Sequence, residues 1–172
     1  MSRLRMVELG RLSDEDWAEL TAGEHEPFGP IGHRLEWRPK ERHLALRGPD
    51  GRLAAAGGAL VARVDAGAES FDVVGVGSLI VTPSLRGTGL LWSLVDPLLR
   101  LARELGAERA MLFCREELVP LYERPGFMRI AAPVRADQPG GRIEMPLAAM
   151  WRPLREGVRW PPGPVEVHGL PF

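Results

Sequence analysis

The chain has 172 residues, enough for one domain with a sizeable buried core. Hydrophobic residues make up 45% of it and charged residues 26%, a composition typical of globular proteins rather than disordered ones. The 22 basic residues are scattered among 23 acidic ones for a net charge of -1, so no basic surface for a nucleic-acid partner is indicated.

The first predicted helix begins after Ser13 and runs to about Ala22. Ser13 is placed to cap it, Asp16 takes the third helical position, and Leu12 can pack on Trp17. Residues 23–39 follow and are broken repeatedly by glycine and proline, which predicts a mobile, loop-rich cover segment with at most a short helix over Ile31–Trp37.

A run of strands is predicted next. His43–Arg47 and Leu53–Val64 form a hairpin through a turn at residues 48–51, whose Gly-Pro-Asp-Gly sequence suits a turn. Phe71–Val81 is rich in valine and predicts a central strand buried on both faces. Gly75 and Gly77 within it indicate a bulge or the close approach of a ligand to the backbone.

The strongest helical pattern covers Gly89–Leu105, where leucines recur on one face, and Gly106 ends it. Pro97 lies inside this pattern, so we expect a kink near Ser93 or a break with a restart at Asp96.

The rest of the chain alternates short elements. We expect a strand over Arg109–Cys114, a short helix over Glu117–Glu123, a strand over Phe127–Ile130 and a last strand over Arg142–Leu147 that closes the sheet. These elements place one domain over residues 1–150. Residues 151–172, rich in proline and tryptophan, are expected to form an irregular arm packed on that domain.

The loop between the central strand and the leucine-rich helix carries the clearest chemical signal. It reads Arg86-Gly87-Thr88-Gly89-Leu90, so backbone N–H groups at a helix start and one arginine converge where an anion such as a pyrophosphate can bind. A dinucleotide-binding fingerprint is excluded because its third glycine is missing, and a Walker loop is excluded because the only lysine, Lys40, lies elsewhere. The alternative to an anion-binding site is a glycine-rich turn that only connects the strand to the helix.

The order of motifs resembles the GNAT superfamily of acetyl-CoA-dependent N-acetyltransferases. The resemblance rests on Val81-x-Pro-x-x-Arg-Gly-x-Gly89, an amphipathic helix, a strand, and then residues 121–127, Leu-Tyr-Glu-Arg-Pro-Gly-Phe. It implies a mixed α/β (α+β) fold whose mostly antiparallel, twisted sheet is flanked by helices and splayed at the coenzyme site. It also implies that Arg86, Gly87, Thr88, Gly89 and Leu90 hold the pyrophosphate of acetyl-CoA, and that the backbone of Leu79 and Val81 pairs with its pantetheine arm.

By the same resemblance, Tyr122 matches the family tyrosine that serves as general acid to the departing thiolate. A phenol with a pKa near 10 is neutral at pH 7 and can donate that proton. A core packing role beside Leu118 is the alternative. The implied reaction is direct attack of an amine on the thioester with no covalent enzyme intermediate, so Cys114, in an apolar strand, is expected to be an inert buried thiol.

The base and the acceptor site are less well indicated. Several GNAT enzymes carry a glutamate on the central strand, but Gly75, Gly77 and Ser78 stand there in this chain, and Glu69 and Asp72 lie only near the strand's beginning.

For the acceptor, the cover segment supplies Glu24, Glu26 and Glu36 as candidates, although each alone reads as a solvated loop residue. The tail is similar to that of aminoglycoside 2'-N-acetyltransferases, which would bring Phe172 and its carboxylate to the acceptor. A proline-rich arm that only covers apolar surface or a dimer partner is the alternative.

Other groups of residues exclude further chemistry. The histidines, at 25, 33, 43 and 168, lack the spacing of a zinc site, so no metal is expected. The single cysteine suits a reducing compartment, and neither a signal peptide nor a stretch of the roughly 20 apolar residues of a membrane span is present, so we expect a cytoplasmic protein with no membrane partner.

The predicted activity is acetyl transfer from acetyl-CoA to a primary amine of a small molecule, with an aminoglycoside-like acceptor as one form. Acetylation of a protein or peptide, and a coenzyme A-binding module without turnover, are the alternatives. A homodimer is common in the family.

Overall fold

The structure is a computed structural model that describes residues 3–172. Its strands and helices run β1 (Arg5–Leu9), α1 (Asp14–Thr21), α2 (Gly29–Arg34), β2 (Arg42–Arg47), β3 (Leu53–Ala66), β4 (Glu69–Val81), α3 (Leu90–Glu104), β5 (Arg109–Cys114), α4 (Val119–Glu123), β6 (Met128–Arg129), β7 (Val134–Gln138), β8 (Gly141–Glu144), β9 (Ala148–Pro153) and β10 (Val165–Val167), with 3₁₀ turns at Pro83–Leu85 and Glu116–Leu118. No helix among the described residues is long and apolar enough to cross a membrane.

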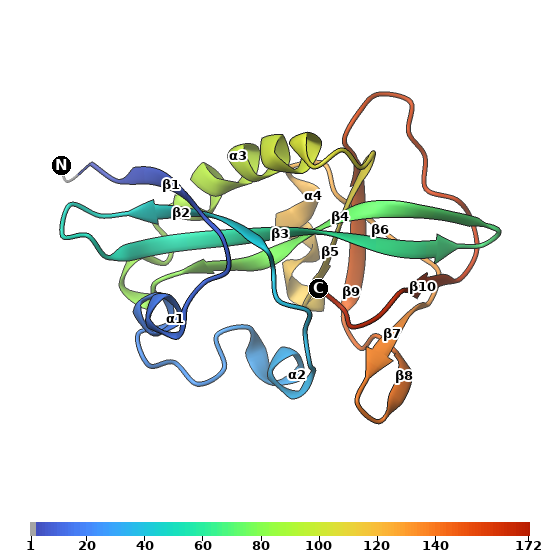
Figure 1. The fold of residues 1–172 in the computed structure, drawn as a ribbon, viewed down its shortest axis with the longest axis horizontal. Helices are drawn as coiled ribbons and strands as arrows, with labels where there is room; N and C mark the ends of the chain where they lie inside the picture. Colours follow the sequence, from blue (N-terminus) through green and yellow to red (C-terminus); the bar gives the residue numbers. More distant parts are fainter. Residues whose placement is uncertain (1–2) are drawn as a thin grey trace.

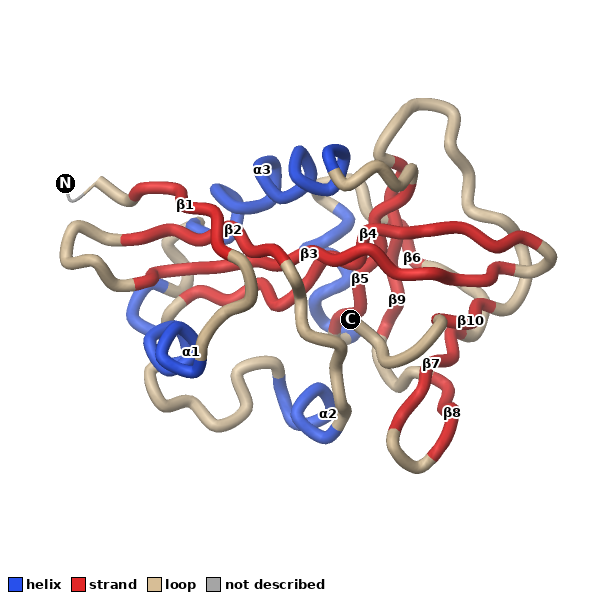
Figure 2. Tube along the Cα trace, in the orientation of Figure 1, coloured by secondary structure: helices blue, strands red, loops and turns tan. Residues whose placement is uncertain are grey.

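One ten-stranded mixed sheet organises the molecule (Figures 1 and 2). Its main path is β6-β9-β5-β4-β3-β10-β7-β8, and β1 and β2 extend it beside the first half of β3. Most pairs are antiparallel, while β4–β5 and β10–β7 are parallel. The sheet is flanked by helices, as the resemblance implied, and the mixed α/β fold is confirmed.

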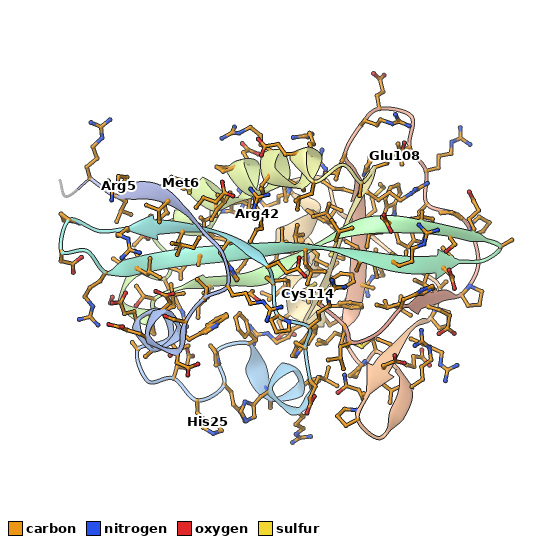
Figure 3. All side chains as sticks on the ribbon, in the orientation of Figure 1. Arg5, Met6, His25, Arg42, Glu108 and Cys114 are labelled. Carbon is orange, nitrogen blue, oxygen red and sulfur yellow. The ribbon has the colours of Figure 1, made fainter. Side chains whose placement is uncertain are left out.

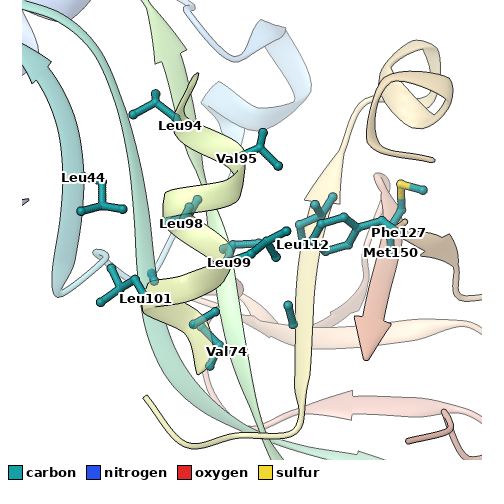
Figure 4. Close-up of a cluster of buried hydrophobic side chains, with 14 of the residues drawn as sticks. Leu44, Val74, Leu94, Val95, Leu98, Leu99, Leu101, Leu112, Phe127 and Met150 are labelled. Atoms are coloured by element: carbon teal, nitrogen blue, oxygen red, sulfur yellow. The ribbon is translucent and has the colours of Figure 1, made fainter. Parts of the chain in front are cut away.

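The helices cover opposite faces of the sheet because neighbouring residues of each strand point to opposite sides. Ala55 of β3 packs in the cluster beneath α3, whereas Ala56 packs in the cluster beneath α1. Leu94, Leu98 and other residues of α3 fill the space over the central strands (Figure 4). Burying this continuous apolar face supplies most of the stability of an amphipathic helix.

Several local predictions are confirmed in detail. Ser13 and Asp16 form a capping box at α1, with Ser13 N–H donating to Asp16 and Asp16 N–H donating to Ser13 Oγ at 3.1 Å. The β2–β3 hairpin closes as expected, with Gly48 N–H donating to the carbonyl of Arg52 at 2.8 Å. Of the two alternatives expected at Pro97, the break with a restart at Asp96 is wrong, because α3 is continuous from Leu90 to Glu104.

Element boundaries near both ends of the chain differ from the predictions. The predicted closing strand over 142–147 is shorter and forms a terminal hairpin, because β8 ends at Glu144 and pairs only with β7. The strand beside β5 is instead β9, which starts just after Pro146 and lacks the β-branched residues that mark a strand. The strand β1 was also not predicted.

The proline-rich tail is more ordered than an irregular arm. Val165–Val167 forms β10, which inserts between β3 and β7 in the sheet. Trp160 packs on the edge of Phe71 with ring centroids 5.4 Å apart, and Phe172 is only 2% exposed. Residues 161–164 contain three prolines, which are uncommon in strands, so the sequence pattern did not predict the strand that follows them.

Candidate functional site

The sheet opens between β4 and β5. These parallel strands pair only at Val74 with Ala110 and at Gly75 with Met111. Beyond those pairs the strand ends Gly77–Leu79 and Leu112–Cys114 line a cavity of about 590 Å³ instead of bonding to each other. The splay expected between the two strands is therefore present, and this cavity lies in it.

A bulge shapes the β4 side of this cavity. The β3–β4 register pairs Ala56 with Ile80 but Gly58 with Gly77, so β4 carries one residue more than β3 over that stretch. Ser78 takes a left-handed conformation with φ of 52° at this point. A bulge leaves a residue out of the ladder and redirects its backbone groups, and here both Ser78 and Leu79 line the cavity.

The glycines of β4 make room for side chains of the same chain. A Cβ added at Gly75 would lie 2.3 Å from the ring of Phe172, and one added at Gly77 would lie 3.3 Å from Lys40 Nζ. The sequence had indicated a bulge or the approach of a ligand at these glycines. The bulge is present, and the space over the two glycines is taken by Phe172 and Lys40.

Tyr122 lies on α4 and lines the cavity together with Leu79. Burial raises the pKa of its phenol above the ordinary value, with a further contribution from Cys114. The phenol therefore stays neutral across the physiological range and retains a proton to donate. Its ring also packs edge-on to Phe127, with centroids 6.4 Å apart, so it has a packing role besides.

Cys114 also lines the cavity, near the centre of the molecule (Figure 3). Burial raises the pKa of its thiol to about 11, and Sγ lies 3.9 Å from Met150 Sδ. A thiol that stays protonated at neutral pH is a poor nucleophile. This agrees with the expectation of an inert buried cysteine.

The glycine-rich loop lies outside the cavity, where β4 leads into α3. Gly87 and Gly89 have φ of 79° and 84°, and nothing occupies the space where their side chains would be. Gly89 caps α3 without any side-chain hydrogen bond. Trp92 N–H donates to the carbonyl of Gly89 at 3.1 Å, while the N–H groups of Leu90 and Leu91 at the start of this 15-residue helix have no side-chain cap, which is the basis of anion binding at helix starts.

Arg86 is already paired in this loop. Its Nε donates to the carbonyl of Val81 at 3.1 Å, and its Nη1 and Nη2 donate to the two carboxylate oxygens of Glu24, the former at 3.1 Å. The hydrogen bond raises the pKa of Arg86 and lowers the pKa of Glu24. Glu24, predicted near the acceptor, therefore lies at the loop, where it accepts hydrogen bonds from both terminal nitrogens of Arg86.

The other predicted acids lie away from the cavity. Glu26 sits beside His25 on the surface, and Glu36 engages Gln138 through its backbone N–H at 2.9 Å. Asp72 pairs with Arg63 at 3.3 Å in the outer half of the β3–β4 hairpin, where Glu69 also lies. Of the predicted site residues, the cavity brings together Leu79, Tyr122 and Phe172.

Two buried polar residues were missed as site residues by the sequence reading. Lys40 is 6% exposed and His43 is 2% exposed, and both line the cavity. Burial lowers the pKa of Lys40 to about 8 and, as the largest cause, also lowers the pKa of His43. The only signal in the sequence was that Lys40 is the sole lysine of an arginine-rich chain.

One surface cluster of potential metal ligands was not predicted from the spacing of the histidines. His25, Glu26 and His33 bring ligand atoms within 4.8 Å of one another, and all three are exposed. His25 lies at the outer edge of the molecule in Figure 3, away from Cys114. Neither this cluster nor its residues line the cavity.

Most of the chain matches a known protein family. Residues 9–127 match the model of the Acetyltransferase (GNAT) family, which is well over half of the chain. The chain belongs to the GNAT family. It is accordingly an acetyl-CoA-dependent N-acetyltransferase, with acetyl-CoA as its cosubstrate. Among curated proteins no match is found.

Solved structures share the GNAT fold with this chain at low sequence identity. The GNAT family N-acetyltransferase YhbS from Escherichia coli, in complex with CoA, is 23% identical, with a TM-score of 0.61 over 98% of this chain and 96% of its own. A GCN5-related N-acetyltransferase from Kribbella flavida is 20% identical, with a TM-score of 0.57 over 86% and 97%. N-acetylglutamate synthase from Neisseria gonorrhoeae, complexed with coenzyme A and N-acetyl-glutamate, is 16% identical, with a TM-score of 0.58 over 90% and 36%.

Proposed function

We propose that this GNAT protein acetylates a primary amine on a small molecule by direct attack of the amine on acetyl-CoA. One observation carries the proposal: the bulged end of β4, the neutral phenol of Tyr122 and a cavity for a second substrate meet where β4 and β5 separate. The expected donor site, at the start of α3, adjoins that opening through the end of β4.

The donor is held at two places in this proposal. The pyrophosphate binds N–H groups of the loop Gly87–Leu90, where the space beside Gly87 and Gly89 is open, and it takes over the guanidinium of Arg86 from Glu24. The pantetheine arm follows the backbone of Leu79 and Val81, as an added strand does. The Escherichia coli neighbour, solved with CoA, supports a coenzyme site of this kind.

The chemical step needs no covalent enzyme intermediate. The neutral amine attacks the thioester carbonyl, its N–C bond forms, and a backbone N–H near Leu79 stabilises the oxyanion. The C–S bond then breaks. Tyr122 donates its proton to the departing thiolate. The attacking amine loses one proton to solvent, and the phenolate takes one proton back from solvent, so the phenol is neutral again.

Acetylation of a protein or peptide and a binding module without turnover are the rival functions. The cavity beneath the cover segment, which Trp37 and Phe28 line, has a volume of about 590 Å³, which favours a small acceptor over an extended peptide. The glycines at the usual place of a strand glutamate motivate the module without turnover. Release of free coenzyme A thiol with a panel of small amines and lysine peptides, read by mass spectrometry of the products, separates all three.

The donor site is tested by binding calorimetry with acetyl-CoA. We expect Arg86→Ala and Gly89→Trp to weaken binding, the second by blocking the helix start. Arg63→Ala removes another exposed, paired arginine, and Gly157→Trp changes another open glycine with φ of 81°, so these are the matched controls. Undiminished affinity in both loop variants would eliminate the proposed pyrophosphate site.

A cytoplasmic location and a homodimer complete the proposal. The single cysteine, Cys114, is buried and unpaired, which suits a reducing compartment. The homodimer is supported only by its frequency in the GNAT family. Light scattering at several protein concentrations measures the oligomeric state, and a mass of one chain at all of them would contradict the dimer.

A further inference from the structure

Lys40 is a buried lysine that packs against two glycines of the central strands. Its stem lies over Gly58 of β3, where an added Cβ would approach Lys40 Cγ to 2.6 Å, and its Nζ lies over Gly77 of β4. Gly58 and Gly77 are register partners across the two strands. A pair of facing glycines in the centre of the sheet thus makes a channel that this one side chain fills.

Lys40 lacks a counter-charge in this channel. It forms no ion pair with an acidic side chain among residues 3–172, and burial is the whole cause of its lowered pKa. A buried ammonium without an anion carries a large desolvation penalty. An anionic ligand that enters the cavity removes that penalty, so the channel selects for a negative group.

His43 supplies the complementary atom. Its Nδ1 lies 2.7 Å from the carbonyl oxygen of Gly10 and must donate, since a carbonyl only accepts. Nε2 of the neutral ring is then an acceptor, and it is buried without a partner. It lies beside the lysine stem, because a Cβ at Gly58 would be 2.8 Å from it. The cavity lining therefore offers one cationic donor, Lys40 Nζ over Gly77, and one neutral acceptor, His43 Nε2 over its register partner Gly58.

The remaining lining is apolar inside and basic at the mouth. Aromatic rings of Trp37, Phe113 and Phe172 line the cavity around Lys40. The other charged groups that line it are Arg11, Asp14, Arg38 and Arg115, none of them buried. Asp14 is the only side-chain carboxylate among them, and Phe172, which also lines the cavity, carries the terminal carboxylate, so cationic groups outnumber anionic ones in this lining.

We infer that the acceptor is an α-amino acid with an apolar side chain, whose carboxylate binds Lys40 and whose amine donates to His43 Nε2. This inference rests on the proposed function and names its substrate class. A carboxylate and an amine on one carbon match a donor and an acceptor that lie over the paired glycines Gly77 and Gly58, and the aromatic lining receives the side chain.

Binding tests the inference without turnover. We expect 3-phenylpropionate to bind the wild-type protein in calorimetry, and the neutral 3-phenylpropionamide to bind about 10- to 100-fold more weakly, the usual range for a hydrogen bond to a charged group. Lys40→Met should abolish the difference, because an apolar side chain of similar length replaces a buried charge without loss of folding. Arg38→Met, which removes a cation at the mouth, should keep it. Equal binding of the acid and the amide to the wild type overturns the inference.

The single lysine gives a second readout that needs no variant. In protein labelled with ¹³C-lysine, Lys40 is the only lysine signal. At pH 8 we expect its Cε resonance to move toward the protonated position when 3-phenylpropionate is added, and to stay in place with the amide. A resonance that moves equally with both probes, or with neither, overturns the inference.

Turnover separates this inference from the proposed function. We expect L-phenylalanine to be acetylated at least about 10-fold more efficiently in kcat/KM than 2-phenylethylamine, and the preference to vanish in Lys40→Met. Acetylation of both amines without preference contradicts the amino-acid inference and leaves the proposed function standing. Binding of the acid probe with no acetyl transfer to any amine contradicts the proposed function instead.

Discussion

The loop at the start of α3 and the cavity between β4 and β5 are built in opposite ways. The loop is exposed, its groups are backbone N–H donors, and its one charged side chain, Arg86, is already paired with Glu24. The cavity includes buried side chains such as His43 and Phe172, and its one buried charge, Lys40, forms no ion pair with an acidic side chain among residues 3–172. A backbone site suits a ligand common to a whole family, whereas an unpaired buried charge suits a ligand particular to this protein.

The largest expected effect lies on the cavity side. Tyr122→Phe keeps the ring that packs on Phe127 and removes only the hydroxyl. Loss of a general acid should lower kcat by about 100-fold or more, with little change in the Kd of acetyl-CoA. Steady-state kinetics and calorimetry on one preparation measure both. Full activity in the variant would assign Tyr122 to packing alone and leave the cavity without its proposed acid.

A second variant tests whether the glycine channel exists to hold Lys40. Gly58→Ala places a methyl group within 2.6 to 2.8 Å of Lys40 and His43. We expect a loss of about 2 kcal/mol in the free energy of unfolding, as in other overpacked sites, measured by urea denaturation. Gly140→Ala, where nothing lies within 4 Å, is the control and should change little. Equal free energies of unfolding for Gly58→Ala and Gly140→Ala would mean that the channel accommodates a methyl group beside Lys40 without strain.

The buried charge also predicts how stability depends on pH. The pKa of Lys40 is about 8 in the folded protein and 10.5 as its ordinary value, so the unfolded chain binds more protons between these values. The penalty for burying the charge is complete below pH 8 and shrinks as the pH rises toward 10.5. From pH 7 to 9 the wild type should gain about 1.4 kcal/mol relative to Lys40→Met.

Comparison with Lys40→Met isolates this effect, because Cys114 titrates in both proteins and cancels. Urea denaturation of the two proteins at each pH gives the difference. A difference that does not change between pH 7 and 9 would show that Lys40 is solvated in the folded state, and the contrast with the exposed loop would then disappear.

The same contrast explains which features the sequence could predict. The glycine-rich loop and the leucine-rich helix follow from short-range patterns of glycine, proline and leucine spacing, and Tyr122 was singled out by the motif that resembles the GNAT family. Lys40, His43 and Phe172 come from distant segments, and only the tertiary fold places them over Gly58, Gly75 and Gly77. The strand β10 was missed for a similar reason, since its three residues carry too little local signal and are held by β3 and β7.

The smallest expected effect concerns the loop. In the proposed donor site Glu24 competes with the pyrophosphate for Arg86, so we expect Glu24→Gln to strengthen acetyl-CoA binding, whereas Arg86→Ala should weaken it. Exposed ion pairs contribute little, and we therefore expect a gain of only about 3-fold in affinity, declining as salt is added. Asp72→Asn, which releases Arg63 elsewhere on the surface, is the matched control and should leave the affinity unchanged. If Glu24→Gln weakens binding, the pair instead holds Arg86 in place for the coenzyme, and the loop resembles the cavity in depending on side chains positioned from distant parts of the chain.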